Sequence, residues 1–316
     1  MNRARSQASG YAIAMLVACS APAVVAEETV SFDPQHNPQT QQLADELAEQ
    51  GVPNAWLEQA LAQASYRQEV LDAMAGAAER RLRWFEYRDI FLTEQRIDEG
   101  AAFMKAHADA LAHAESEYGV PPEVITAIMG VETYYGRHKG RHKVLDSLAT
   151  LAFHHPVRGD FFRGELAAFL TIAYQQEVAP ESLYGSYAGA MGYPQFIPTS
   201  YQAYAVDFDG DAKRDLWNNP VDAIGSVANY FAEHGWQRGG AIYHEAEGPE
   251  ELPEALSFNQ TVRPSTTAAE AAEQGVVTET SLTPDTPVVP LVLEYADGQE
   301  SYRLGEYNFY GVTRYN

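Results

Sequence analysis

The spacing of apolar residues predicts that most of the chain is helical. Through residues 41–116, apolar side chains recur every three or four positions, which is the period of an amphipathic helix. LADELAEQG ends at a glycine, Pro53 opens NAWLEQALAQA, and residues 94–119 form one long amphipathic run. Near the other end, residues 288–307 alternate apolar and polar side chains, as paired strands do. The pattern therefore predicts a mainly α chain with a small β-rich part.

One carboxylate lies where the helical pattern calls for an apolar residue. In VPPEVITAIMGVETYYG, residues 120–136, Pro122 favours a helix start and Gly136 a stop. One helix face carries four residues spaced at i, i+3, i+4 and i+7: Ile125, Ile128, Met129 and Glu132. Burial there would raise the pKa of Glu132, as a general acid working near neutral pH requires. The spacing equally allows a Glu at the edge of the stripe that pairs with Arg137.

A strip of aromatic and arginine residues precedes this helix. RRLRWFEYRDIFLTEQR contains four aromatic residues among its arginines: Trp84, Phe85, Tyr87 and Phe91. We expect most of these rings to pack in the core, although such a strip can also line a sugar groove.

Composition excludes one large class of partners. Acidic residues outnumber basic ones by 44 to 21, which gives a net charge of −23. Because binding phosphates requires a basic surface, we expect no nucleic-acid partner. At 316 residues and 46% hydrophobic content, the chain can bury a sizeable core divided into two or three sub-domains.

The first 26 residues predict export. Arg3 and Arg5 precede a short apolar run, too short to span a bilayer, and small residues follow. Two cleavage sites compete: residues 24–26 suit ordinary cleavage, whereas residues 16–19, Leu-Val-Ala-Cys, resemble a bacterial lipobox that would leave a lipidated Cys19. Cys19 is the only cysteine, so no intrachain disulfide can form, and it is otherwise an incidental apolar residue of the signal.

A second unusual stretch is SYAGAMGYPQFIPTSY, residues 186–201. Its glycines and prolines favour neither helix nor strand, so we expect an irregular loop whose backbone a ligand can approach closely. Ser186 and Gln195 are then candidate ligand contacts. A purely structural tight loop has the same composition.

Alternating carboxylates predict a calcium loop in the third stretch. Four of them occupy positions 1, 3, 5 and 9 of such a loop: Asp207, Asp209, Asp211 and Asp215. The match is imperfect, because Ala212 stands at the glycine position and Asn218 replaces the closing glutamate. Asp222 could close a slightly longer loop. The alternative is an acidic turn that faces solvent.

Together, GVETYYG, SYAGAMGYPQFIPTSY, DFDGD with LWNNPVDAIGSVANYF, and the closing NFYGVTRYN resemble the membrane-bound lytic murein transglycosylase B family, in order and spacing. The resemblance covers about residues 40–316 and implies a mainly α (α+β) fold, with a lysozyme-like helical core. The implied boundaries are a signal peptide at 1–26, a tether at 27–40, a helical domain at 41–112, the catalytic core at 113–240, a small β domain at 241–306 and a return strand to the active site at 307–316. The Thr/Pro/Ala-rich stretch at 260–287 would be a loop.

Residue by residue, the resemblance implies that Glu132 is the single catalytic acid/base. Ser186 and Gln195 match groups that contact the saccharide, and four more residues look like cleft residues: Tyr87, Arg158, Tyr230 and Tyr315. Phe161 stands where relatives tend to carry tyrosine, so one hydroxyl contact would be missing. The implied calcium ligands are Asp207, Asp209, Asp211, Asp222 and the backbone carbonyl of Lys213, in a loop one residue longer than the family's.

The resemblance also implies the reaction. Glu132 would protonate the oxygen between N-acetylmuramic acid and N-acetylglucosamine and then deprotonate the muramic C6 hydroxyl, which yields 1,6-anhydromuramic acid without water. Beyond a structural calcium ion no cofactor is implied. The partners would be the glycan strands of peptidoglycan and, through a lipid anchor, the outer membrane. We expect a periplasmic monomer, either an outer-membrane lipoprotein or a soluble protein.

Two other functions stay open at this level. A non-catalytic peptidoglycan-binding scaffold would release no fragment, and a hydrolytic muramidase would leave reducing muramic ends. Relatives continue beyond the position of Asn316 into a serine and a terminal helix, so the chain looks truncated. The truncation would affect how the helical domain packs.

Overall fold

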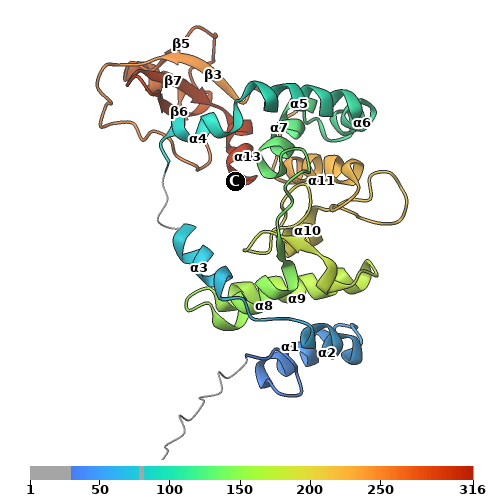
Figure 1. Cartoon of the computed structure of the whole chain (residues 1–316). Helices are drawn as coiled ribbons and strands as arrows, with labels where there is room; N and C mark the ends of the chain where they lie inside the picture. The colour runs from blue at the N-terminus through green and yellow to red at the C-terminus, as the bar shows by residue number, and fades with distance from the viewer. Residues whose placement is uncertain (1–29, 78–81, 316) are drawn as a thin grey trace, which may run out of the picture. The chain divides into compact units, whose positions relative to one another are not determined.

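Helices dominate the described part of the chain, residues 30–77 and 82–315 of a computed structural model (Figure 1). The predicted signal peptide with Cys19, and Asn316, lie outside this part. The helices before residue 134 are α1 (Pro38–Glu49), α2 (Asn54–Ala62), α3 (Gln68–Ala77), α4 (Trp84–Phe91), α5 (Glu94–Ala106), α6 (Ala108–Tyr118) and α7 (Pro122–Thr133). The later ones are α8 (Val144–His154), α9 (Gly159–Gln175), η1 (Pro180–Ser182), α10 (Pro198–Tyr204), α11 (Pro220–Glu233), α12 (Ala268–Glu273) and α13 (Tyr307–Tyr315).

The centre of the helical core is α8. All nine residues from Val144 to Ala152 are buried, as is typical of a central helix covered on every side, and three of them are polar: Asp146, Ser147 and Thr150. It packs against α9, which covers one side, and against α3. Figure 1 shows α8 and α9 running side by side.

A second group of helices surrounds α11. This helix packs against α6, α7 and α10, while α5 packs against α7. The predicted single run at residues 94–119 is therefore wrong in one respect, because it forms two helices that break at His107. The break lets α5 follow α7 while α6 follows α11.

The β-rich part is one antiparallel sheet with the strand order β4-β6-β7-β3-β5. Its strands are β3 (Tyr243–Glu247), β4 (Thr266–Thr267), β5 (Val277–Thr278), β6 (Pro287–Glu294) and β7 (Glu300–Gly305). The strands predicted at residues 288–307 are confirmed as far as Gly305, because β6 and β7 pair from Val289↔Gly305 to Glu294↔Glu300. Burial does not alternate along β6, since residues 288–291 are all buried. The predicted loop at 260–287 is wrong in part, since it contains β4, α12 and β5.

The closing segment corrects another prediction. Residues 307–315 form the helix α13 and not a return strand. The side chain of Asn308 bonds to the backbone of Gln237 and Gly240, and Gly311 lies against Trp236. These tertiary contacts override the strand preference of an aromatic-rich sequence.

The predicted tether at 27–40 is also wrong from Ser31 onward. Phe32 is 1% exposed and packs against Phe153, and Ser31 bridges to Ser65. Burying a phenylalanine side chain contributes about 1.5–3 kcal/mol, which offsets the cost of ordering one or two backbone residues at about 1–2 kcal/mol each. The side chain of Asn37 then caps α1.

The aromatic residues of α4 do not pack in the core as expected. No residue of this helix is buried, and Trp84 and Tyr87 are exposed.

Within the described ranges, no helix is both long and apolar enough to cross a membrane.

Candidate active site

Glu132 lies in the last turn of α7, and its side chain is half-buried. The predicted start at Pro122 is confirmed, and the apolar face is buried as predicted: Ile125, Ile128 and Met129 are at most 6% exposed. Arg137 pairs with Glu99, with 2.7 Å between Nη1 and Oε2. Glu132 therefore stands at the border between the apolar core and solvent, where its carboxyl group is partly desolvated.

The turn after α7 is strained and firmly held. Tyr134, Tyr135 and Gly136 have φ values of 53°, 58° and 86°, and a non-glycine residue in this region costs about 1–3 kcal/mol. Arg96 offsets this cost, because its guanidinium lies 4.2 Å from the Tyr134 ring centre and its backbone oxygen accepts a 2.8 Å bond from the Tyr135 hydroxyl. At Gly136, a Cβ would stand 1.9 Å from the Tyr193 ring, so only glycine fits.

Two helical glycines make room for the Tyr135 ring. A Cβ at Gly100 of α5 would lie 2.5 Å from the Tyr135 hydroxyl, and one at Gly130 of α7 would lie 2.9 Å from it. Arg96 of α5 also donates to the Gly130 oxygen at 2.9 Å. α5 thereby fixes the end of α7, and with it the position of Glu132.

The irregular loop predicted from residue 186 is confirmed up to Ile197, after which α10 begins. The Ser186 hydroxyl accepts the N–H groups of Ala188 and Ala190 at 3.2 and 3.0 Å. The Gln195 amide donates to the backbone oxygens of Gly192 and Lys139 at 2.8 and 3.3 Å. Both half-buried side chains therefore hold the loop in shape, and each keeps an unassigned polar function for a ligand: the hydroxyl hydrogen of Ser186 and the amide oxygen of Gln195.

A threonine connects this loop to α7. The Thr133 hydroxyl donates to the Tyr193 backbone oxygen at 3.0 Å and accepts the Gly136 N–H at 3.0 Å. Glu132 is the neighbour of Thr133 in sequence. The loop with Gln195 is thus tied to the residue beside the carboxylate.

Two tyrosines from other helices complete this region. Tyr230 of α11 and Tyr315 of α13 have ring centres 4.7 Å apart, and the Tyr315 hydroxyl donates to the Pro194 oxygen at 2.9 Å. Burial, followed by the negative charge of Glu132, raises the pKa of Tyr315 well above its usual value. Burial raises the pKa of Tyr230 to about 12, and its hydroxyl donates to the Arg314 oxygen. The structure therefore brings Glu132, the 186–197 loop, Tyr230 and Tyr315 together.

The other two predicted cleft residues take no part in these contacts. Tyr87 is 44% exposed on α4, with its ring 5.1 Å from Phe91. Arg158 is exposed before α9, and its guanidinium lies 4.5 Å from the ring centre of Phe161, which is itself 42% exposed. Both present planar groups to solvent that suit contact with a sugar ring.

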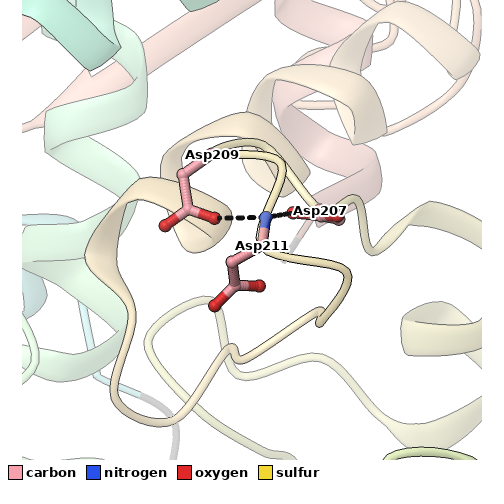
Figure 2. A group of neighbouring side chains, drawn as sticks. All are labelled: Asp207, Asp209 and Asp211. Carbon is pink, nitrogen blue, oxygen red and sulfur yellow. Dashed lines mark hydrogen bonds between the residues drawn. The ribbon is translucent and has the colours of Figure 1, made fainter.

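The predicted calcium loop brings three carboxylates together (Figure 2). Each of Asp207, Asp209 and Asp211 offers an oxygen, and these oxygens lie within 4.8 Å of one another. Ala212 has a φ of +70°, so the sixth loop position adopts the left-handed conformation that a calcium loop requires there, although it is not glycine. The donor set and the backbone conformation both fit a hard cation.

Asp222 supports this loop from the first turn of α11. It is fully buried, and its two oxygens accept the N–H groups of Phe208 and Asp215, each at 2.8 Å. Burial raises the pKa of Asp222, the two N–H bonds lower it in part, and the charges of Asp209 and Asp207 raise it further. The carboxylate ties both ends of the acidic loop together. Lys213 donates its N–H to Asp211 at 2.8 Å.

Sequence reasoning missed three residues that build the site: Thr133, Tyr193 and Lys139. Lys139 donates to the Trp217 oxygen at 2.6 Å and lies 4.4 Å from the Tyr193 ring centre. Burial lowers the pKa of Lys139, and the Asp215 charge offsets part of this shift. Lys139 lies in the basic stretch RHKGRHK, which looks like a solvent-exposed segment, so the sequence gives no local sign that this side chain is partly buried.

Comparison with known proteins identifies relatives along nearly the whole chain. The family model described as "Transglycosylase SLT domain" matches residues 35–316. Membrane-bound lytic murein transglycosylase B of Escherichia coli (strain K12) is 39% identical over 292 residues, which cover 89% of this chain and 79% of the relative.

Solved structures agree with this match. The soluble lytic transglycosylase SltB1 of Pseudomonas aeruginosa is 45% identical with a TM-score of 0.80, and the alignment covers 87% of this chain and 92% of that one. The E. coli lytic transglycosylase Slt35, solved in complex with calcium, is 40% identical with a TM-score of 0.80, covering 91% and 90%. SltB3 of P. aeruginosa, solved with NAG-NAM-pentapeptide, is 32% identical with a TM-score of 0.76, covering 87% and 75%. The predicted family and the mainly α fold class are thereby confirmed.

Proposed function

Because the chain belongs to the lytic transglycosylase family with the SLT domain, we propose that it cleaves the bond between N-acetylmuramic acid and N-acetylglucosamine in peptidoglycan and forms 1,6-anhydromuramic acid. One observation carries the proposal: a half-buried carboxyl group, Glu132, is joined through Thr133 to a tight polar loop and lies within electrostatic reach of Tyr315.

Glu132 does the proton chemistry in this proposal. A single carboxyl group first donates its proton to the bridging oxygen as the bond to the anomeric carbon breaks. The acetamido oxygen of the muramic acid stabilises the positive anomeric carbon. Glu132, now ionised, accepts the proton of the C6 hydroxyl, whose oxygen closes the 1,6-anhydro ring. The reaction needs no second carboxylate and consumes no water, whereas ordinary glycosidases use both.

The surrounding groups bind and orient the sugar. Ser186 and Gln195 are proposed to contact the saccharide through the hydroxyl hydrogen and the amide oxygen that the loop leaves available. Tyr230 and Tyr315 donate their hydroxyl hydrogens to backbone oxygens, so toward the sugar their hydroxyl oxygens would act as acceptors. Tyr87 and Arg158 would provide outer contacts through their exposed planar groups.

A calcium ion would stabilise the 207–222 loop and take no part in the chemistry. The proposed ligands are Asp207, Asp209, Asp211, Asp222 and the Lys213 carbonyl. Three clustered carboxylates with N–H bonds to each of them make a pre-formed oxygen site, which is what calcium binds. The relative Slt35 was solved in complex with calcium.

The protein is proposed to act in the periplasm. Its substrate class is located there, and the first residues carry the pattern of an export signal. Cys19 would anchor the protein to the outer membrane through attached lipid. Cell fractionation tests this point: a soluble protein that begins at Glu27 would contradict the anchor and leave the catalytic assignment intact.

The substitution Glu132→Gln tests the catalytic assignment. The amide keeps the shape but cannot deliver a proton, so cleavage of glycan strands should fall by at least the ~10²–10⁴-fold that a general acid/base contributes. The melting temperature and the binding of an uncleaved glycan oligomer should stay close to those of the wild type. Near-normal cleavage by the variant would show that Glu132 is not the acid.

A further inference from the structure

A basic hollow lies outside the residues assigned above. Its volume is about 270 Å³, and its cationic lining residues are Arg67, Arg141 and Lys143 together with His142. Because a water molecule takes up about 30 Å³ of the liquid, this volume suits a small group such as one amino-acid residue. Two acidic residues, Glu69 and Asp146, line it as well.

The positive charges in this hollow are only partly neutralised within the protein. Asp146 is almost fully buried and forms a 2.8 Å ion pair with Arg67, so the charges of these two residues neutralise each other. Of the remaining charged lining residues, one is acidic, Glu69, and two are basic, Arg141 and Lys143. An excess of positive charge is notable in a chain whose net charge is −23.

The sequence around the hollow repeats itself. Residues 137–143 read RHKGRHK, and the two copies have different roles. In the first copy, Arg137 pairs with Glu99, and Lys139 donates to the Trp217 oxygen. In the second copy, Arg141 and Lys143 line the hollow. The first copy is therefore used for packing, while the second is available for a ligand.

The hollow adjoins the loop assigned to the glycan. Lys143 pairs with Tyr184, and His142 with Gly185, in the short antiparallel pair of β1 (His142–Lys143) and β2 (Tyr184–Gly185). The next residue is Ser186, a proposed saccharide contact. A ligand that reaches from the glycan past Ser186 would enter the hollow beside Tyr184, which lines it.

The floor of the hollow also favours an anion. Helix α8 begins at Val144 with no side-chain cap, so its positive end faces this region. Ser147, one turn into α8, lines the hollow, and its buried hydroxyl has no hydrogen-bond partner among the described residues. Such a group costs free energy until a water or a ligand satisfies it.

We propose that this hollow binds a carboxylate of the peptide stem attached to N-acetylmuramic acid. This inference rests on the proposed function. It predicts that the enzyme prefers glycan strands that still carry their peptide stems. The glycan itself offers neutral hydroxyl and acetamido groups, whereas the stem carries carboxylates that Arg141 and Lys143 can bind with charge-assisted hydrogen bonds. The relative SltB3 was solved with a sugar that carries a pentapeptide.

The test compares strands that keep their stems with strands from which an amidase has removed them. The wild type should cleave stem-bearing strands with the higher kcat/KM. The double variant Arg141→Gln/Lys143→Gln should lose that preference, by about 10–100-fold, because hydrogen bonds to charged groups are worth about 1.5–3 kcal/mol. Its rate on stem-free strands should match that of the wild type, which also shows that it is folded.

A matched control removes two positive charges elsewhere. Lys105→Gln/Arg263→Gln changes exposed residues and lowers the net charge equally, so it reports any general effect of charge on an anionic substrate. It should keep the stem preference. A variant at 141 and 143 that also keeps the preference, or a wild type that has none, would overturn the inference.

Two further outcomes separate the explanations. Failure of the wild type to cleave either kind of strand would contradict the proposed function itself. Competition distinguishes a stem site from a general anion site: the free stem peptide should inhibit cleavage of stem-bearing strands by the wild type and not by the double variant. Equal inhibition by inorganic phosphate, with none by the stem peptide, would overturn the stem assignment.

Discussion

The hydroxyl of Thr133 donates to the backbone oxygen of Tyr193 at 3.0 Å, across 60 positions of the sequence. The same hydroxyl accepts the Gly136 N–H at 3.0 Å, so one side chain holds both the end of α7 and the loop that carries Gln195. Since Glu132 is the preceding residue, this bond sets how the proposed acid faces the proposed saccharide contacts. Positioning of this kind decides whether the glycosidic bond of a bound glycan can react.

Replacing Thr133 by valine should therefore weaken both stability and cleavage. Valine keeps the shape but leaves the Tyr193 oxygen and the Gly136 N–H without this partner, and an unsatisfied buried group costs about 1–3 kcal/mol. Urea unfolding should show a loss of that size, and the rate of glycan cleavage should fall. Thr133→Ser keeps the hydroxyl and should retain most of both. A valine variant equal to the wild type would show that the bond has no role.

Calcium should raise the melting temperature of the protein. An ion that binds only the folded state stabilises it by mass action, by about 2.7 kcal/mol when its concentration is 100 times Kd. Differential scanning calorimetry in calcium and in chelator measures the gain directly. An unchanged melting curve would contradict calcium binding and would mean that residues 207–211 form an acidic turn that faces solvent.

The variant for this test is Asp211→Ala. The Asp211 carboxylate accepts one N–H bond, from Lys213, whereas Asp207 accepts three, so the change at 211 perturbs the loop less. The calcium-dependent gain should disappear, while the melting temperature in chelator should change little. Asp285→Ala, at an exposed acidic residue elsewhere, should keep the full gain.

His107 should make the folded state less stable in mild acid. Its ring lies 4.5 Å from Phe103 at the α5–α6 break, and burial lowers its pKa below the usual 6.5. The unfolded chain then binds the extra proton first, so this contribution is present above pH 6.5 and is lost as the pH falls through the folded pKa. Urea unfolding at pH 7.5 and at lower pH should show a smaller difference for His107→Gln than for the wild type. An equal difference would exclude this role.

Local patterns predicted the start of α7 and its buried face. Pro122 begins the helix, and Ile125, Ile128 and Met129 are buried because their spacing matches one face of a helix. The pair β6–β7 was also predicted, although residues 288–291 of β6 are buried continuously and not alternately. Ala212 has a φ of +70°, so the left-handed conformation predicted for glycine at this position is adopted by another residue.

Other features depend on contacts that no local pattern encodes. NFYGVTRYN has a strand-like composition, yet Asn308 bonds to the backbone near Trp236 and α13 is helical. Thr133 and Tyr193 are distant in sequence, and so is one of the two groups that contact the half-buried Lys139, the backbone oxygen of Trp217. The exposed aromatic residues of α4 show the reverse case, where an apolar pattern does not lead to burial.

Mass spectrometry of the fragments released from purified murein sacculi tests the central claim most directly. The wild type should release muropeptides that end in 1,6-anhydromuramic acid, lighter by one water molecule than the hydrolytic products, and Glu132→Gln should release none. Fragments with reducing muramic ends would show hydrolysis, and the absence of fragments from the wild type would show a binding protein. Either result would contradict the single-carboxylate transglycosylase proposed for Glu132.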